Sequence, residues 1–276
     1  MRLNHRSRRF DVTNLCAVAG VSASAVTLLQ AATAVVALRS GRRDYADAVW
    51  GPGLAAVSLV SAVVGRGNPW RRWSLAVVST GWAVRLERQM LSRVRGSDDE
   101  DPRYTEFLEG ASTPKVVAKV FLTQGLSQLL VSAPVQLAAA STLPRSPRRW
   151  LAPAGVAVMV AGTVVEALAD RQKQQYTQRD DEQKPKILDT GLWGWSRHPN
   201  YFGDSLVWDG AYLAAAASSP AGWALPAPAL MSYLLMFATG AKRTERRMQD
   251  RPGYSDYQRR VAFFLPRPPR EGESAS

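Results

Sequence analysis

Long stretches without charged residues divide this chain into apolar segments separated by short polar ones. The longest are residues 12–38, 120–144 and 210–241, with 27, 25 and 32 residues. A helix of about 20 mostly apolar residues crosses the hydrocarbon core of a bilayer. Because backbone polar groups inside lipid must be satisfied within the chain, these segments are expected to be helices. The pattern therefore predicts an all-α, polytopic membrane helical bundle.

Seven candidate spans follow from this pattern. Pro220, Pro226 and Pro228 separate the last two, and charged residues enter the third near its end, which is expected among the lipid headgroups. We expect a single membrane domain over residues 1–265 and a disordered tail over residues 266–276. The seven candidate spans are about residues 12–38, 48–65, 73–91, 120–143, 150–170, 201–217 and 221–241.

The average composition hides this pattern, because the charges are clustered. The 276 residues have a mean hydropathy of −0.17, which is ordinary for a soluble protein, and a net charge of +12. The single cysteine, Cys16, excludes an intramolecular disulfide, and two histidines, His5 and His198, argue against a histidine-rich metal site. The chain has no P-loop, G-x-G-x-x-G, G-x-S-x-G or H-E-x-x-H motif. We expect no metal ion and no nucleic-acid partner.

Lysine and arginine residues are distributed unevenly between the two sides of the predicted bundle. One side carries ten of them and the other carries 25. Cytoplasmic loops of membrane proteins have an excess of Lys and Arg. The side with 25, which includes the loop around His198, is therefore expected in the cytoplasm, although the basic first ten residues fall on the other side.

Four polar residues near the end of the fifth span share one helix face. Glu166, Asp170, Lys173 and Thr177 are separated by four, three and four positions. Glu166 follows sixteen charge-free residues, and an acid at membrane depth costs about 2.5–3.5 kcal/mol and usually serves a function. The alternative is a solvated helix end that leaves the membrane.

Residues 191–204 combine an arginine, a histidine and several aromatic side chains before a predicted helix. Pro199 suits the first helical turn, where free N–H groups and the helix dipole favour an anion. Arg197 adds a bidentate phosphate ligand, and His198 can hydrogen-bond a ribose or phosphate oxygen or fix the turn. This inventory fits a nucleotide cofactor. The alternative is an interfacial Trp/Arg anchor with a helix cap.

The nonapeptide Ser-Arg-His-Pro-Asn-Tyr-Phe-Gly-Asp at residues 196–204 resembles the signature of the steroid 5-alpha-reductase-like membrane family, in its bacterial branch. Its core, Arg-His-Pro-Asn-Tyr-x-Gly, is also similar to that of isoprenylcysteine carboxyl methyltransferases and sterol reductases. The resemblance covers nearly the whole chain and extends to residues 82–86, 101–104, 124–125 and 166–172 and to Trp208, Gly210, Glu245, Tyr254 and Tyr257.

The resemblance implies a seven-helix membrane reductase that binds NADPH in a cytoplasm-facing pocket. The reaction it implies is hydride transfer to a carbon–carbon double bond conjugated with a carbonyl, in a steroid, isoprenoid or fatty-acyl substrate. By position, Glu166 and Asp170 match the family's amide-and-acid pair. Asn200 and Tyr201 match the motif's cofactor-contacting pair, and Asp204 matches its usual Glu. With the residues argued from their chemistry, the candidate cofactor-binding set is Glu166, Asp170, Lys173, Arg197, His198, Asn200, Tyr201, Asp204 and Tyr254.

Reduction of such a substrate also requires a group that protonates or polarises its carbonyl oxygen. The steroid-reducing branch uses a Glu on its second helix and a Tyr on its third. Asp47 is the candidate for the first role, whereas the third span here has no Tyr. Gln124 is the second catalytic candidate; it shares a helix face with Gln128, and the alternative is that both only join helices. Tyr45 and Arg85 are further candidates.

Two other functions are compatible with these residues. An S-adenosylmethionine-dependent membrane methyltransferase shares the Arg-His-Pro-Asn-Tyr core, and a non-catalytic membrane scaffold would bind no nucleotide. For the reductase we expect a bacterial inner (plasma) membrane location, with active-site loops facing the cytoplasm and a lipid-like substrate and the bilayer as partners.

Overall fold

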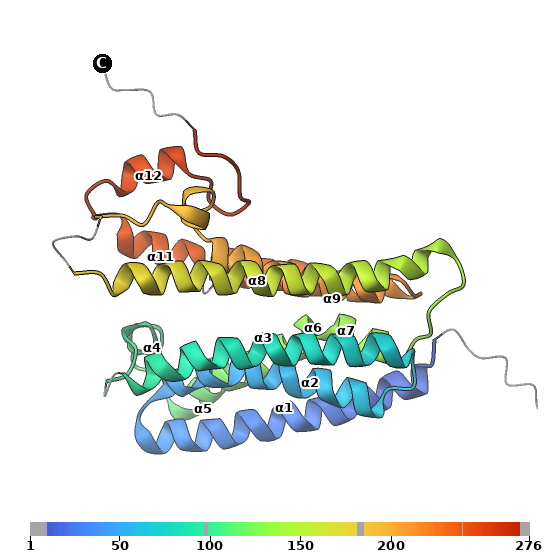
Figure 1. The fold of residues 1–276 in the computed structure, drawn as a ribbon. Coiled ribbons are helices and arrows are strands. Elements are labelled where there is room, and N and C mark those ends of the chain that lie inside the picture. Colours follow the sequence, from blue (N-terminus) through green and yellow to red (C-terminus); the bar gives the residue numbers. More distant parts are fainter. Residues whose placement is uncertain (1–9, 97–98, 181–184, 239, 271–276) are drawn as a thin grey trace, which may run out of the picture. The chain divides into compact units, whose positions relative to one another are not determined.

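The computed structural model describes residues 10–96, 99–180, 185–238 and 240–270 (Figure 1). The regular structure of these ranges is helical, apart from two isolated β-bridges, which confirms the all-α prediction. The basic start, including His5, and residues 271–276 of the predicted tail lie outside the described residues. The chain forms two compact units, residues 1–156 with 211–227 and residues 157–210 with 228–276.

The first unit is built around the three helices α1, α2 and α3. The helix α2 packs against both α1 and α3. Its close approach to α3 depends on Gly51, since a Cβ there would lie 3.2 Å from the backbone oxygen of Ala83. The helices of this unit are α1 (Val12–Ser40), the 3₁₀-helix η1 (Arg43–Val49), α2 (Trp50–Val64), α3 (Pro69–Arg95), α4 (Pro102–Phe107), α5 (Thr113–Val116), the π-helix η2 (Val117–Leu122), α6 (Thr123–Val131), α7 (Ala133–Ala139), and the 3₁₀-helices η3 (Pro147–Trp150) and η5 (Ala221–Ala224).

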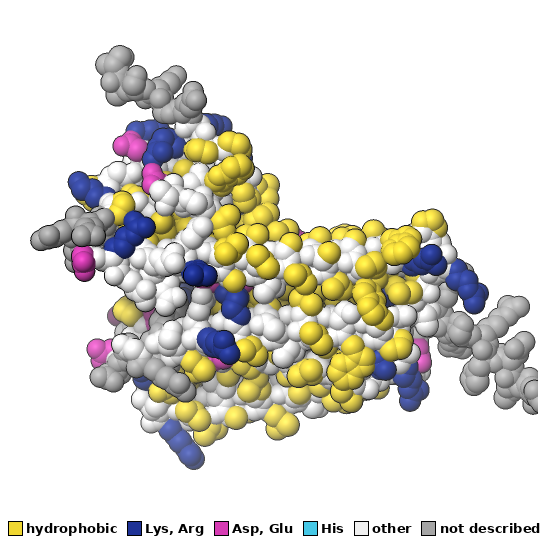
Figure 2. All heavy atoms as spheres, viewed as in Figure 1, with side chains coloured by type: hydrophobic (Ala, Val, Ile, Leu, Met, Phe, Trp, Pro, Cys, Tyr) yellow, Lys and Arg dark blue, Asp and Glu magenta, His cyan; other side chains and the backbone are white. Residues whose placement is uncertain are grey.

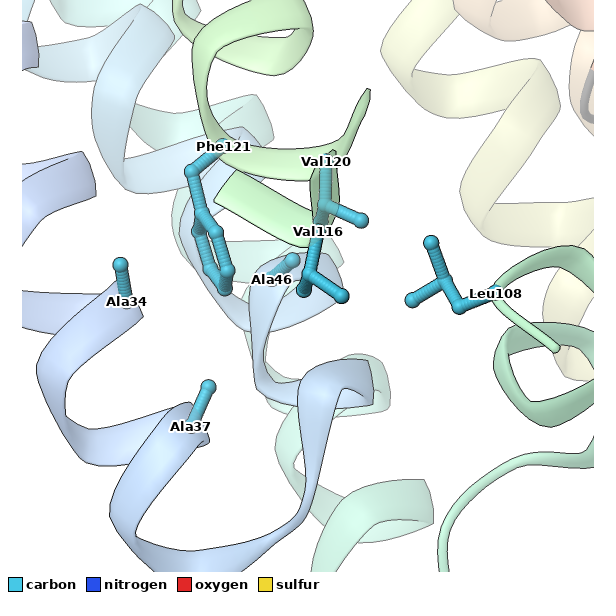
Figure 3. Close-up of a cluster of buried hydrophobic side chains, with 7 residues drawn as sticks. All are labelled: Ala34, Ala37, Ala46, Leu108, Val116, Val120 and Phe121. Carbon is cyan, nitrogen blue, oxygen red and sulfur yellow. The ribbon is translucent and has the colours of Figure 1, made fainter. Parts of the chain in front are cut away.

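A cluster of buried apolar side chains joins the end of α1 to η1, η2 and the residue after α4 (Figure 3). Ala34, Ala37 and Ala46 are small enough for the backbones to approach closely, and Leu108 and Phe121 supply most of the buried volume. Burial of a Leu or Phe side chain stabilises a fold by about 1.5–3 kcal/mol. The cluster therefore fixes η1, which carries the predicted catalytic Asp47.

The second unit contains most of the two long helices α8 and α9, together with the C-terminal helices. Within it, α8 and α9 touch at two glycines: a Cβ at Gly162 would lie 2.5 Å from the oxygen of Gly203, and one at Gly203 would lie 2.6 Å from the nitrogen of Glu166. The close approach brings the polar face of α8 against the first turns of α9. The helices are α8 (Leu151–Thr177), the 3₁₀-helix η4 (Gly191–Gly194), α9 (Pro199–Ala216), α10 (Pro226–Tyr233), the π-helix η6 (Leu234–Ala238), α11 (Ala241–Met248) and α12 (Tyr254–Arg260).

Several helical stretches are long and apolar enough to cross a membrane, which supports the membrane prediction but not its count of seven. Among the described residues there are four, and a fifth if a pair bent by 46° is one span. The helices α3 and α9 are not among these stretches, because α3 carries several charges such as Arg85 and α9 is too polar over its 18 residues. The stretches are Val12–Ser40, Arg43–Val64, Pro147–Thr177 and Gly222–Met248, and the bent pair is Thr113–Val131 with Ala133–Ala139.

Candidate functional site

The turn before α9 is fixed by the C-terminal segment of the second unit. Ser196 forms a parallel β-bridge with Ala262, and the backbone nitrogen of Arg197 donates to the Ala262 oxygen at 2.8 Å. The hydroxyl of Ser196 donates to the Phe264 oxygen at 2.7 Å and accepts from the His198 nitrogen at 3.1 Å. The helix then begins at Pro199, as the sequence predicts.

Glu245 on α11 is the carboxylate at the centre of this turn. Its Oε1 lies 2.8 Å from Nε of Arg197 and 3.3 Å from Nε2 of His198, and its Oε2 accepts a long hydrogen bond of 3.4 Å from Gln258. A second guanidinium nitrogen of Arg197 donates to the backbone oxygen of Gln258 at 2.8 Å. The guanidinium that the sequence assigns to a phosphate is thus already paired within the protein.

His198 is buried and stacked between aromatic rings. Its ring lies nearly parallel to Tyr201, with centroids 5.7 Å apart, and edge-on to Phe263 at 5.5 Å. Burial lowers the pKa of His198, and the hydrogen bond of its ring to the Glu245 carboxylate offsets this only in part. The imidazole is therefore neutral near pH 7 and offers one donor and one acceptor.

The acids of α8 meet the motif of α9 at the Asp170–Asn200 pair. The amide nitrogen of Asn200 donates to Oδ1 of Asp170 at 3.2 Å. The amide oxygen of Asn200 is buried and has no hydrogen-bond partner among the described residues. Glu166 and Asp204 lie beside this pair, one helical turn away on each helix, and are only 4 % and 6 % exposed. The site therefore presents several buried acceptors and one oxygen that lacks a donor.

The remaining predicted residues of this unit surround the turn. Lys173 lies 5.9 Å from the ring centroid of Trp193, whose indole nitrogen donates to the Ala169 oxygen at 3.0 Å. Tyr257 donates to the Trp193 oxygen at 2.7 Å. Tyr254 is almost fully buried, and burial raises its pKa to about 12. Both tyrosines are therefore neutral and serve as hydrogen-bond groups at physiological pH.

Asp47 lies in the first unit and forms a second polar cluster there. Its Oδ1 accepts from the Tyr104 hydroxyl at 2.6 Å, and its Oδ2 accepts from Arg103 at 2.8 Å. Arg103 also pairs with Asp101 at 2.7 Å. Burial and the Asp47 carboxylate hold the pKa of Tyr104 well above its usual range. Tyr104 is thus a hydrogen-bond donor and a weak acid.

Tyr104 is a functional candidate that sequence reasoning missed. The resemblance includes residues 101–104, but it assigns no role to Tyr104. The steroid-reducing branch has its tyrosine on the third helix, where this chain has none, and Tyr104 lies instead on α4, 57 positions after Asp47. Its place directly after the Asp-Pro-Arg start of a short helix was the only available signal.

Gln124 and Gln128 both donate to backbone oxygens where η1 meets α2. Gln124 Nε2 donates to the Ala46 oxygen at 2.7 Å, and Gln128 Nε2 donates to the Val49 oxygen at 2.7 Å. Gln128 also accepts from Gln30 at 3.0 Å. These bonds hold the backbone next to Asp47.

Comparison with known proteins gives one family and one distant relative. A family model described as "Protein of unknown function (DUF1295)" matches residues 34–261. An 81-residue segment, 28 % of this chain, is 36 % identical to "Uncharacterized protein C594.04c" of Schizosaccharomyces pombe. The matched segment covers 23 % of that protein, so the likeness spans less than a quarter of its length. No solved structure matches the chain.

Proposed function

Because this chain belongs to the DUF1295 family, which is related to the steroid 5-alpha-reductases, we propose that it is a membrane-embedded NADPH-dependent reductase. The bond reduced is a carbon–carbon double bond conjugated with a carbonyl, in a lipid-like substrate of steroid, isoprenoid or fatty-acyl type. The observation that carries the proposal is the Asp170–Asn200 pair, whose amide oxygen is buried without a donor. Such an oxygen costs stability unless a ligand supplies the donor.

The donor and acceptor groups of this cluster suit a nicotinamide nucleotide. Ribose hydroxyls and a carboxamide are hydrogen-bond donors, which buried carboxylates and an amide oxygen accept. Glu166, Asp170, Asn200 and Asp204 are assigned to these groups. NADPH, when bound, supplies the hydride.

The phosphates and rings of the nucleotide need cations and aromatic faces. Lys173 provides a cation as a point charge, and Arg197 is assigned to a phosphate although its guanidinium is also paired with Glu245. His198 and Tyr201 present parallel rings at the start of α9, where the helix dipole also favours an anion. Tyr254 lies next to these cofactor-binding candidates, because its side chain hydrogen-bonds Glu245.

We propose Asp47 and Tyr104 as the pair that binds the substrate carbonyl. Negative charge develops on that oxygen as hydride is added, and a preorganised donor stabilises it. The Tyr104 hydroxyl is such a donor, supported by its 2.6 Å bond to Asp47. Gln124 is assigned to hold the backbone before Asp47 through its bond to Ala46.

We also propose that α3 and α9 cross the bilayer, giving seven spans, with the loop before α9 in the cytoplasm of a bacterial inner membrane. Their 27 and 18 residues correspond to about 40 and 27 Å of helix, and the excess of Lys and Arg supports the orientation. In a Cys16→Ser background, a cysteine at Asp180 should react with an impermeant thiol reagent only from the cytoplasm, and one at Ser146 only from outside. Labelling of the Asp180 position from outside would contradict this topology.

The cofactor is tested by titrating the detergent-purified protein with NADPH and, separately, with S-adenosylmethionine. We expect NADPH to bind and Asp170→Ala and Asn200→Ala each to lose about 10- to 150-fold in affinity, because a hydrogen bond to a charged group contributes about 1.5–3 kcal/mol. Gln178→Ala, at the exposed residue after α8, is the matched control and should bind normally. Binding of S-adenosylmethionine alone would instead indicate a methyltransferase.

A further inference from the structure

Two large apolar side chains are exposed beside the C-terminal segment of the second unit. Trp195 is 50 % exposed and Leu265 is 69 % exposed. The backbone nitrogen of Arg267 donates to the Trp195 oxygen at 3.1 Å, so the segment after Leu265 lies along the loop that carries Trp195. Trp195, Leu265, Arg267 and Arg270 are called the Trp195 face below.

The C-terminal residues of the Trp195 face lie in a strongly basic part of the chain. Residues 241–270 contain nine Lys and Arg against three acids, and one of those acids, Glu245, is buried against Arg197. Arg267 and Arg270 are exposed, and the backbone of Arg270 is held by a 3.0 Å bond to the Arg260 oxygen. Figure 2 shows Lys and Arg side chains gathered over the helices α11 and α12.

The position of the Trp195 face in the chain is juxtamembrane. Leu265, Arg267 and Arg270 follow the apolar stretch Gly222–Met248, whose end reaches the membrane surface if the stretch crosses the bilayer, and the Arg267–Trp195 backbone bond holds Trp195 beside them. Tryptophan rings prefer the headgroup region, and basic segments next to a span are attracted to anionic lipids. Apolar contact and charge together give stable interfacial binding where either alone is weak.

We propose that the Trp195 face lies in the interfacial layer of the bilayer and binds the headgroups of anionic phospholipids. Trp195 and Leu265 enter the layer at headgroup level, and Arg267 and Arg270 pair with lipid phosphates. The proposal does not depend on the identity of the nucleotide or the substrate.

The test uses the full chain in lipid nanodiscs. Cys16, the single cysteine, is replaced by Ser, Leu265→Cys is introduced, and the new thiol carries an environment-sensitive fluorophore. Nanodiscs contain phosphatidylcholine with an increasing share of phosphatidylglycerol. We expect the emission to shift to the blue as phosphatidylglycerol increases, with quenching by a headgroup-level nitroxide lipid. Arg267→Gln and Arg270→Gln should each raise the phosphatidylglycerol share needed for half of the shift, by about fivefold in the limit of weak binding.

Two controls distinguish lipid binding by the Trp195 face from non-specific attraction of a basic protein to anionic lipids. A fluorophore at Ser255→Cys, an exposed position on α12, should stay in water with every lipid. Arg251→Gln and Arg259→Gln, also at exposed positions, each remove one positive charge outside the face and should each change the half-maximal share less. A label at position 265 that stays in water overturns the proposal. So does an equal effect of the control substitutions, or a blue shift that is the same without phosphatidylglycerol.

Discussion

Glu245 and Asp47 are both acids that bind an arginine and an aromatic or imidazole group, yet their surroundings differ. In the second unit the side chains of Glu245 and Arg197 are 9 % and 11 % exposed. In the first unit those of Asp47 and Arg103 are 25 % and 22 % exposed. A buried pair cannot lose one partner without leaving a desolvated charge, whereas water screens a partly exposed pair. We therefore expect Glu245 to stabilise the fold, and we propose that Asp47 can exchange partners with a ligand.

The largest expected effect follows removal of the buried carboxylate charge. Glu245→Gln leaves the Arg197 guanidinium without its counter-charge and should lower stability by about 3 kcal/mol, measured by thermal unfolding in detergent. Asp250→Asn, at an exposed acid close in sequence, is the control and should change stability little. A loss no larger than that of the control would mean that Arg197 is stabilised by other groups.

A smaller effect is expected from pH through His198. Because burial lowers the pKa of His198 below its unfolded value of about 6.5, the unfolded chain binds the proton first as pH falls. Stability contributed by the neutral ring is complete above about pH 6.5 and is lost below it. His198→Gln should flatten the dependence of the unfolding temperature on pH between about 7 and 5. An unchanged slope in the variant would assign the dependence to another group.

The smallest stability effect is expected at the partly exposed pair. Arg103→Gln removes one partner of Asp47 and should cost about 1 kcal/mol or less, with most of that difference lost in high salt. Unfolding temperatures at low and high salt measure it. A loss as large as that of Glu245→Gln, insensitive to salt, would remove the distinction between the two clusters.

The sequence predicted the helical class, the membrane setting and the start of α9 at Pro199, because charge-free runs and a proline at a helix start are local signals. The resemblance assigned Asp170 and Asn200 to one cofactor site but did not predict the contact between them, since spacing places Asp170 only on a face of its own helix. The periodicity of the sequence could not show that Glu245 forms an ion pair with Arg197 or that Tyr104 donates a hydrogen bond to Asp47. Those contacts join residues 48 and 57 positions apart, and the packing of other elements brings them together.

The number of membrane spans also could not be predicted from the sequence alone. Residues 73–91 and 201–217 were predicted to be spans from their length and their apolar residues, but α3 and α9 also bury polar groups within the protein. Asp204 is buried although its helix is too polar to qualify as a span. Composition along the chain does not distinguish a charge that faces lipid from one that faces a neighbouring helix.

The most direct test of the central claim is photo-cross-linking with an azido analogue of NADPH, followed by peptide mapping of the purified protein. The account predicts that the label is found on peptides within residues 166–204 and that unlabelled NADPH, but not S-adenosylmethionine, prevents it. Labelling that NADPH does not prevent, or that occurs only outside these residues, would contradict the assignment of the Asp170–Asn200 cluster as the nucleotide site.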